Sequence, residues 1–144
     1  MDRQPPTRPR SSASWAGLLF TSRAVPHNVG MSGHSERVQS VLDYIRGAWE
    51  STVRRVDHDA HPRLYLPHEF TSPCASDRFR ELYYWDTYFA HLGLLRQGRA
   101  HLAQSNVQNM FYMVEKFGFV LNSNAVYHLN RSQPPYLAMM VRDL

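Results

Sequence analysis

The sequence predicts an all-α fold in which helices are joined in antiparallel pairs. Apolar residues recur at spacings of three and four along three segments, which is the period of a helix with one buried face. Glycines follow two of these segments at positions typical of helix ends, and prolines gather in the connections. With 144 residues and 43% hydrophobic content, the chain can bury one core of ordinary domain size.

The first 34 residues lack this apolar pattern. They are rich in Pro, Ser and Gly, so we predict a disordered leader over residues 1–34 and a folded unit over residues 35–144. The apolar stretch from Ser14 to Phe20 is too short to span a membrane. Thr21, Ser22 and Arg23 follow it, which is not a clear signal-peptide cleavage pattern. We therefore predict a cytoplasmic location.

The charges of the chain favour neither nucleic acid nor metal as a partner. The folded part is close to neutral, with 12 basic and 11 acidic residues, and it has no lysine-rich run. Cys74 is the only cysteine, so no internal disulfide forms. His58 and His61 have the spacing of half a metal site, but no further Cys or His pair completes it. We interpret them as part of a surface turn and predict no metal and no cofactor.

The first predicted helix covers residues 36 to about 55. Its apolar face needs a partner and consists of Val38, Val41, Leu42, Ile45 and Trp49. The following residues 57–77 contain three prolines, which predicts an extended connection with a short segment from Leu64 to Leu66.

Three further helices follow in the second half. Asp77 is placed to cap the second, which runs to Gly93 or Gly98. The third is predicted from Ala100 to Phe117, where Gly118 ends it. Its expected inward residues are Val107, Met110, Phe111 and Val114. After a loop or short hairpin, Pro134 and Pro135 begin a fourth helix. Paired helices at this spacing suit an α/α toroid, in which loops at one end form the active site.

Two blocks of sequence combine aromatic and charged residues. The first block is RFRELYYWDTYF, residues 78–89, and the second block is NRSQPP, residues 130–135. Aromatic rings stack on the apolar face of a sugar, while carboxylate, amide and guanidinium groups form hydrogen bonds with its hydroxyls. The blocks therefore predict sugar binding. Within them we expect Glu81 to orient Arg78 or Arg80, and we expect Tyr83 to pack.

Both blocks resemble the trehalase-type glycoside hydrolases. The family signature Arg-Phe-x-Glu-x-Tyr-Tyr-Trp-Asp-x-Tyr is met at every fixed position by residues 78–88, and the second block is similar to a second family block without a gap. The resemblance covers residues 64–144 and implies part of an (α/α)6 toroid, truncated after about four helices. It also implies hydrolysis of α,α-trehalose to glucose with inversion. A complete toroid of twelve helices requires roughly 300 to 400 residues.

The resemblance also implies which residues bind the substrate. They are Arg78, Trp85, Asp86, Asn122, Arg131, Ser132 and Gln133. Asp86 is assigned to substrate hydrogen bonding and not to acid catalysis. The catalytic Asp and Glu of the family lie C-terminal to both blocks, and no residue of this chain matches them. We therefore predict that the chain is inactive alone and that its exposed helix faces favour self-association. A noncatalytic product that binds a sugar or a partner protein is the alternative.

Overall fold

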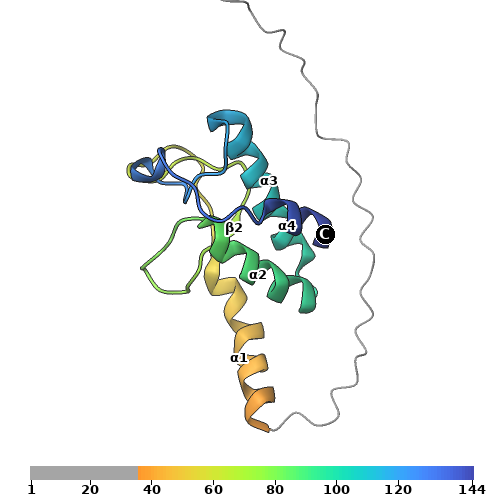
Figure 1. Ribbon diagram of the computed structural model, residues 1–144. Helices are drawn as coiled ribbons and strands as arrows, with labels where there is room; N and C mark the ends of the chain where they lie inside the picture. Colours follow the sequence, from red (N-terminus) through yellow and green to blue (C-terminus); the bar gives the residue numbers. More distant parts are fainter. Residues whose placement is uncertain (1–35) are drawn as a thin grey trace, which may run out of the picture.

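The computed structural model describes residues 36–144, and the predicted leader lies outside them (Figure 1). The elements in chain order are α1 (Glu36–Thr52), β1 (Val53–Arg54), β2 (Phe70–Thr71), α2 (Tyr84–Arg96), α3 (Ala100–Phe117), the 3-10 turn η2 (Val126–His128) and α4 (Leu137–Asp143). The predicted helical class is confirmed. The short antiparallel pair of β1 and β2, with Val53 opposite Thr71, was not predicted.

The core lies where α2, α3 and α4 meet, and α3 also packs against β2. Val107, Met110 and Met113 of α3 lie in it with Met140 of α4. The predicted bounds of α3 are confirmed, and Gly118 ends the helix with a left-handed φ of 85°.

The inward face predicted for α3 is partly wrong. Phe111 and Val114 are 42% and 39% exposed, whereas Asn106 and Asn109 are buried. The reason is that α3 contacts β2 on one side and two helices on the other. Its buried face therefore includes side-chain amides that form hydrogen bonds with neighbouring backbone. The spacing of apolar residues, from which the inward face was predicted, does not reveal such buried polar residues.

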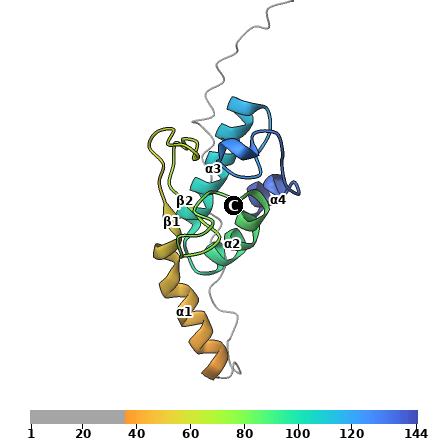
Figure 2. The ribbon, with the colours of Figure 1, turned by 90° about the vertical axis from the view of Figure 1, so that its left-hand side faces the viewer.

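Helix α1 projects from the rest of the structure (Figures 1 and 2). None of its residues is buried, and Val38, Val41 and Ile45 are exposed. Its main anchor is Trp49, which packs against the cluster around Leu94 and donates its indole N–H to the side-chain oxygen of Gln97 at 2.6 Å. Within residues 36–144, the rest of the apolar face of α1 thus lacks the partner that the sequence predicted.

Helix α2 begins at Tyr84, later than the predicted cap at Asp77. Asp77 instead forms an exposed ion pair with Arg80 at 3.0 Å. The backbone N–H groups of Leu82 and Tyr84 bond to residues of the 122–124 segment, and Tyr83 forms a single β-bridge with Ser123, so residues 82 and 83 are held outside the helix. Tertiary hydrogen bonds override the local helical pattern here. Helix α4 likewise begins at Leu137, two residues beyond the prolines.

Three buried asparagine side chains hold the extended segments in place. Asn106 and Asn109 of α3 bond to the backbone of Thr71 and of His68. Asn124 joins two other segments: its Oδ1 accepts the N–H of Leu82 at 2.8 Å, and its Nδ2 donates to the carbonyl of Leu64 at 2.9 Å. An amide can satisfy a backbone donor and a backbone acceptor at once, which explains its use at these junctions. The segment that leads into α2 is positioned in this way.

None of the helices in the described part of the chain has the length and apolar character needed to cross a bilayer.

Candidate sugar-binding site

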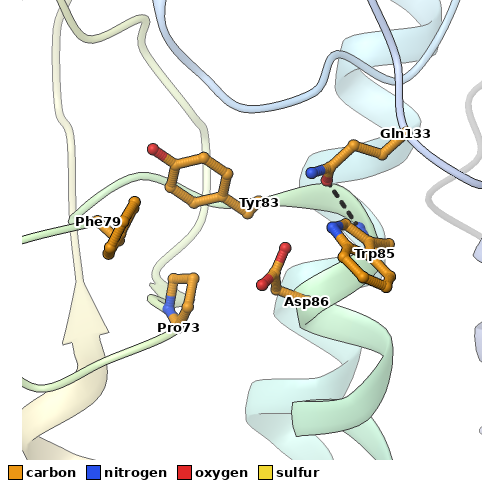
Figure 3. A pocket seen from close by; sticks show the side chains of 6 residues that line it. All are labelled: Pro73, Phe79, Tyr83, Trp85, Asp86 and Gln133. Carbon is orange, nitrogen blue, oxygen red and sulfur yellow. Dashed lines mark hydrogen bonds between the residues drawn. The ribbon is translucent and has the colours of Figure 1, made fainter.

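An open recess of about 270 Å³ lies at the N-terminal end of α2 (Figure 3). Its lining residues are Pro73, Phe79, Tyr83, Trp85, Asp86 and Gln133. Aromatic rings, one carboxylate and one amide therefore face the same space. This is the mixture that a sugar requires, because its ring presents apolar C–H faces and its rim presents hydroxyls.

The two sequence blocks meet at this recess. The backbone N–H of Trp85 donates to Oε1 of Gln133 at 3.1 Å, as Figure 3 shows. Backbone bonds reinforce the junction: Tyr84 N–H donates to the carbonyl of Asn122 at 3.1 Å, and Asn122 N–H donates to the carbonyl of Arg131 at 2.9 Å. The backbone of Asn122 therefore lies between the first and the second block.

Asp86 is the carboxylate of the recess. It lies in the first turn of α2, where the positive end of the helix dipole favours a negative charge. No side chain within residues 36–144 forms a hydrogen bond or ion pair with its carboxylate. Both carboxylate oxygens are thus available to accept hydrogen bonds from a ligand.

Trp85 lies at the edge of the recess and is 40% exposed. Its ring meets Phe89 edge-on at a centroid distance of 5.8 Å, and Tyr88 in turn stacks on Tyr136 at 4.5 Å. The aromatic face beside the recess is therefore continuous from α2 to the segment that precedes α4.

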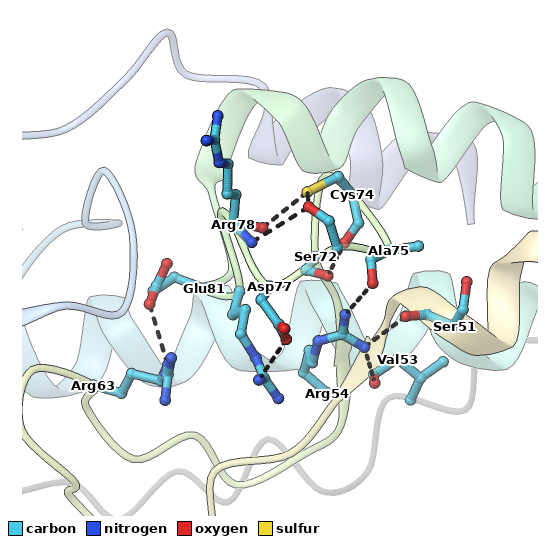
Figure 4. Close-up of polar contacts among 12 residues, drawn as sticks. Ser51, Val53, Arg54, Arg63, Ser72, Cys74, Ala75, Asp77, Arg78 and Glu81 are labelled. Carbon is cyan, nitrogen blue, oxygen red and sulfur yellow. Dashed lines mark hydrogen bonds and ion pairs between the residues drawn. The ribbon is translucent and has the colours of Figure 1, made fainter.

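Four of the predicted substrate-binding residues do not line the recess. Arg78 is exposed, and its carbonyl accepts a hydrogen bond from Sγ of Cys74 at 2.8 Å (Figure 4). Arg131 is exposed and donates Nε–H to Asn130, while Asn122 contributes through its backbone. The hydroxyl of Ser132 donates to the carbonyl of Val120 at 2.7 Å. The substrate-binding roles of all seven residues stay predictions.

Pro73, Phe79 and Tyr83 line the recess but were not among the predicted site residues. Phe79 has a left-handed φ of 51°, which is unusual for a residue other than glycine. Its exposed ring meets Tyr83 edge-on at 5.8 Å. Membership of the first block was the available signal for Phe79 and Tyr83, whereas no pattern in the sequence marks Pro73.

The expected partner of Glu81 was wrong. Glu81 is 6% exposed and accepts a hydrogen bond from Nε of Arg63 at 3.1 Å, while Arg80 pairs with Asp77 (Figure 4). Arg63 belongs to the connection between β1 and β2. Its backbone bridge to Ala125, and the bridge of Tyr83 to Ser123, bring this connection close to the segment that carries Glu81. Arg63 and Glu81 are 18 positions apart in the sequence, so no local pattern predicts their contact.

Tyr83 and His128 lie next to this ion pair. Burial of the phenol, together with the nearby carboxylate of Glu81, raises the pKa of Tyr83 to about 12. His128 accepts or donates a hydrogen bond at 2.6 Å between Nδ1 and the hydroxyl of Ser123. Burial and the charge of Arg131 lower the pKa of His128. Both side chains are thus neutral near pH 7.

Within residues 36–144, no group of three or more His, Cys, Asp or Glu side chains is arranged to hold a metal ion. His58 and His61 are exposed, and Cys74 has a free, half-buried thiol.

Residues 22–144 match the family model described as Trehalase. The chain belongs to the trehalase family. The match is wider than the resemblance over residues 64–144 and includes the region of α1. It includes both sequence blocks.

Two curated relatives show the extent of the similarity. The chain is 40% identical over 104 residues to a periplasmic trehalase of Xanthomonas campestris pv. campestris (strain B100), over 71% of this chain and 18% of the relative. It is 42% identical over 106 residues to a probable trehalase of Oryza sativa subsp. japonica, over 69% of this chain and 18% of the relative. The chain thus spans less than a fifth of the length of these trehalases.

A solved structure supports the fold. The neutral trehalase of Saccharomyces cerevisiae matches with a TM-score of 0.50 and 29% identity, over 70% of this chain and 19% of that one. The predicted fold class, part of a trehalase (α/α)6 toroid containing about four helices, is therefore confirmed.

The predicted cytoplasmic location is wrong by these comparisons. Relatives from Xanthomonas campestris and Escherichia coli O139:H28 are named periplasmic trehalases, and one from Salmonella typhi is named a putative periplasmic trehalase. The prediction depended on a weak cleavage pattern after Phe20, which lies outside the described residues. A single cysteine does not distinguish the compartments, because a chain without a disulfide folds in either.

Proposed function

We propose that this chain forms the sugar-holding side of a glycosidase that hydrolyses α,α-trehalose to glucose. The observation that carries the proposal is the meeting of both blocks at one recess, through the hydrogen bond from Trp85 to Gln133. Trp85 and Tyr83 offer aromatic surface to the pyranose, and Asp86 and Gln133 offer polar groups to its hydroxyls. Arg78 and Arg131 are exposed and are proposed as further donors.

The proposal assigns binding, and not bond cleavage, to the described residues. Hydrolysis with inversion requires a carboxylic acid and a carboxylate about 6.5 to 9.5 Å apart. Asp86 is the one carboxylate among the residues that line the recess in the described part of the chain, since Glu81 is buried against Arg63. The acid and base must then come from other residues, and we expect the 144-residue chain to release no glucose from trehalose by itself.

Calorimetric titration of the purified chain with trehalose tests the binding. We expect saturable binding that Asp86→Asn weakens about 10- to 100-fold, because the loss of one charge-assisted hydrogen bond costs roughly 1.5–3 kcal/mol. Asp77→Asn is the matched control: it removes the same charge from an exposed carboxylate that does not line the recess. Equal weakening by both substitutions, or no binding by the unaltered chain, would contradict the proposal.

A noncatalytic sugar-binding protein is the second candidate, favoured by the single carboxylate in the recess. Sequencing of the transcript distinguishes the two functions. A reading frame that continues into segments with the missing acid and base supports the hydrolase. A frame that stops after Leu144, combined with trehalose binding by the purified chain, supports the noncatalytic protein. Glucose release by the 144-residue chain would contradict our assignment of binding alone.

A further inference from the structure

A chain of contacts links a buried ion pair to the wall of the recess. The carboxylate of Glu81 uses its two oxygens differently: Oε1 accepts from Nε of Arg63 at 3.1 Å, and Oε2 faces the hydroxyl of Tyr83 at 3.4 Å. Tyr83 lines the recess, but Glu81 and Arg63 do not. Glu81 therefore reaches a ligand only through Tyr83.

The ion pair is mostly shielded from water on the side of Glu81. The side chain of Glu81 is 8% exposed and that of Arg63 is 37% exposed. Burial of a carboxylate costs desolvation free energy unless an opposite charge compensates it. The position of Arg63 therefore determines where the carboxylate of Glu81 lies. The position of the second oxygen, and hence of the Tyr83 hydroxyl, follows from that pairing.

The ring of Tyr83 has neighbours on other sides as well. Phe79 meets it edge-on at 5.8 Å and His128 at 6.1 Å. Its backbone pairs with Ser123, which is fully buried. These contacts restrict the ring, but they are apolar or act on the main chain. The hydroxyl of Tyr83 donates to Glu81 at 3.4 Å, and Tyr127 is a second polar neighbour of this hydroxyl that also raises the pKa of Tyr83.

We propose that the Arg63–Glu81 ion pair is a positioning device, which holds Tyr83 in the wall of the recess and thereby sets the affinity for the sugar. This inference rests on the proposed function, because it concerns the same recess. Glu81 and Arg63 are positioning residues, and Tyr83 is the group that contacts the ligand. The distance of 3.4 Å is long for a hydrogen bond between oxygens, so the contact is weak and its loss should cost less than the loss of an ordinary hydrogen bond.

The test uses the full chain with Glu81→Gln, which preserves the shape of the side chain and removes its charge. We expect trehalose affinity to fall about two- to fivefold, at the lower end of the loss expected for one hydrogen bond. We also expect the phenol of Tyr83 to titrate at lower pH, because a nearby negative charge is removed; NMR of tyrosine labelled at Cζ measures this. Asp77→Asn is again the matched control, and it should change neither quantity.

A double-mutant cycle separates positioning from a general structural effect. If Glu81 acts through the hydroxyl of Tyr83, then Glu81→Gln weakens binding in the unaltered chain but adds no loss in the Tyr83→Phe background. Losses that add in the double variant would overturn the proposal. Tyr83→Phe leaves the ion pair intact, so it also provides a test if Glu81→Gln does not fold. Trehalose binding by Tyr83→Phe at the affinity of the unaltered chain would overturn the proposal by itself.

Failure of this inference is distinguishable from failure of the proposed function. Absence of trehalose binding by the unaltered chain refutes the proposed function, whatever the titration of Tyr83 shows. An unchanged Tyr83 titration in Glu81→Gln refutes the positioning contact, even if the chain binds trehalose.

Discussion

Replacement of Asn124 by alanine should destabilise the protein more than any surface substitution. The side chain of Asn124 is fully buried and joins Leu82, in the segment before α2, to Leu64, in the connection between β1 and β2. Alanine leaves the N–H of Leu82 and the carbonyl of Leu64 without these partners. The bond from Leu64 N–H to the carbonyl of residue 124 is a backbone contact and remains.

The expected magnitude follows from the number of backbone groups left unpaired. A buried polar group without a partner costs about 1–3 kcal/mol, and the site near Leu64 is only partly buried, so the sum is roughly 2–4 kcal/mol. That is a large share of the roughly 5–15 kcal/mol that stabilise an ordinary domain. We therefore expect a clearly lower urea midpoint, measured by far-ultraviolet circular dichroism.

Asn130→Ala is the control for this prediction. Asn130 is exposed and contacts Arg131 alone among the described side chains, so its loss should cost less than about 0.5 kcal/mol. Asn124→Asp provides a second test, since aspartate retains an acceptor for Leu82 but cannot donate to Leu64. A loss in Asn124→Ala no larger than that in Asn130→Ala would refute the reasoning, because it would mean that the freed backbone groups find other partners.

Two further predictions concern a helix end and a buried histidine. Gly118→Ala should cost about 1 kcal/mol in a thermal or urea unfolding experiment, because alanine is strained at a φ of 85° although no atom lies within 4 Å of the added Cβ; an unchanged midpoint would contradict this. Burial lowers the pKa of His91, and the nearby Asp143 only partly offsets the effect. The folded state therefore favours the neutral imidazole, so stability is full above the unfolded pKa of about 6.5 and falls as the pH drops below it. His91→Leu should reduce the difference between urea midpoints at neutral and acidic pH, and an undiminished difference would contradict the assignment to His91.

Local patterns in the sequence predicted a helix correctly where a residue of the segment itself ends the helix. The bounds of α3 were predicted correctly, because Gly118 supplies the left-handed residue that stops a helix. The beginning of α2 was predicted wrongly, because the N–H groups of Leu82 and Tyr84 bond to residues about 40 positions away, at Asn124 and Asn122. No local pattern reports such partners.

The sequence by itself determined the family, the residue types that we propose to hold the sugar and the two blocks that carry them. These features depend on residues that are adjacent in the chain, so a sequence motif is enough to identify them. Only the tertiary structure decided that Gln133 bonds to Trp85, that Phe79 and Tyr83 line the recess, and that Glu81 pairs with Arg63. Burial and hydrogen bonding between distant segments select these contacts, because a polar group taken from water must find its partner wherever the fold places one.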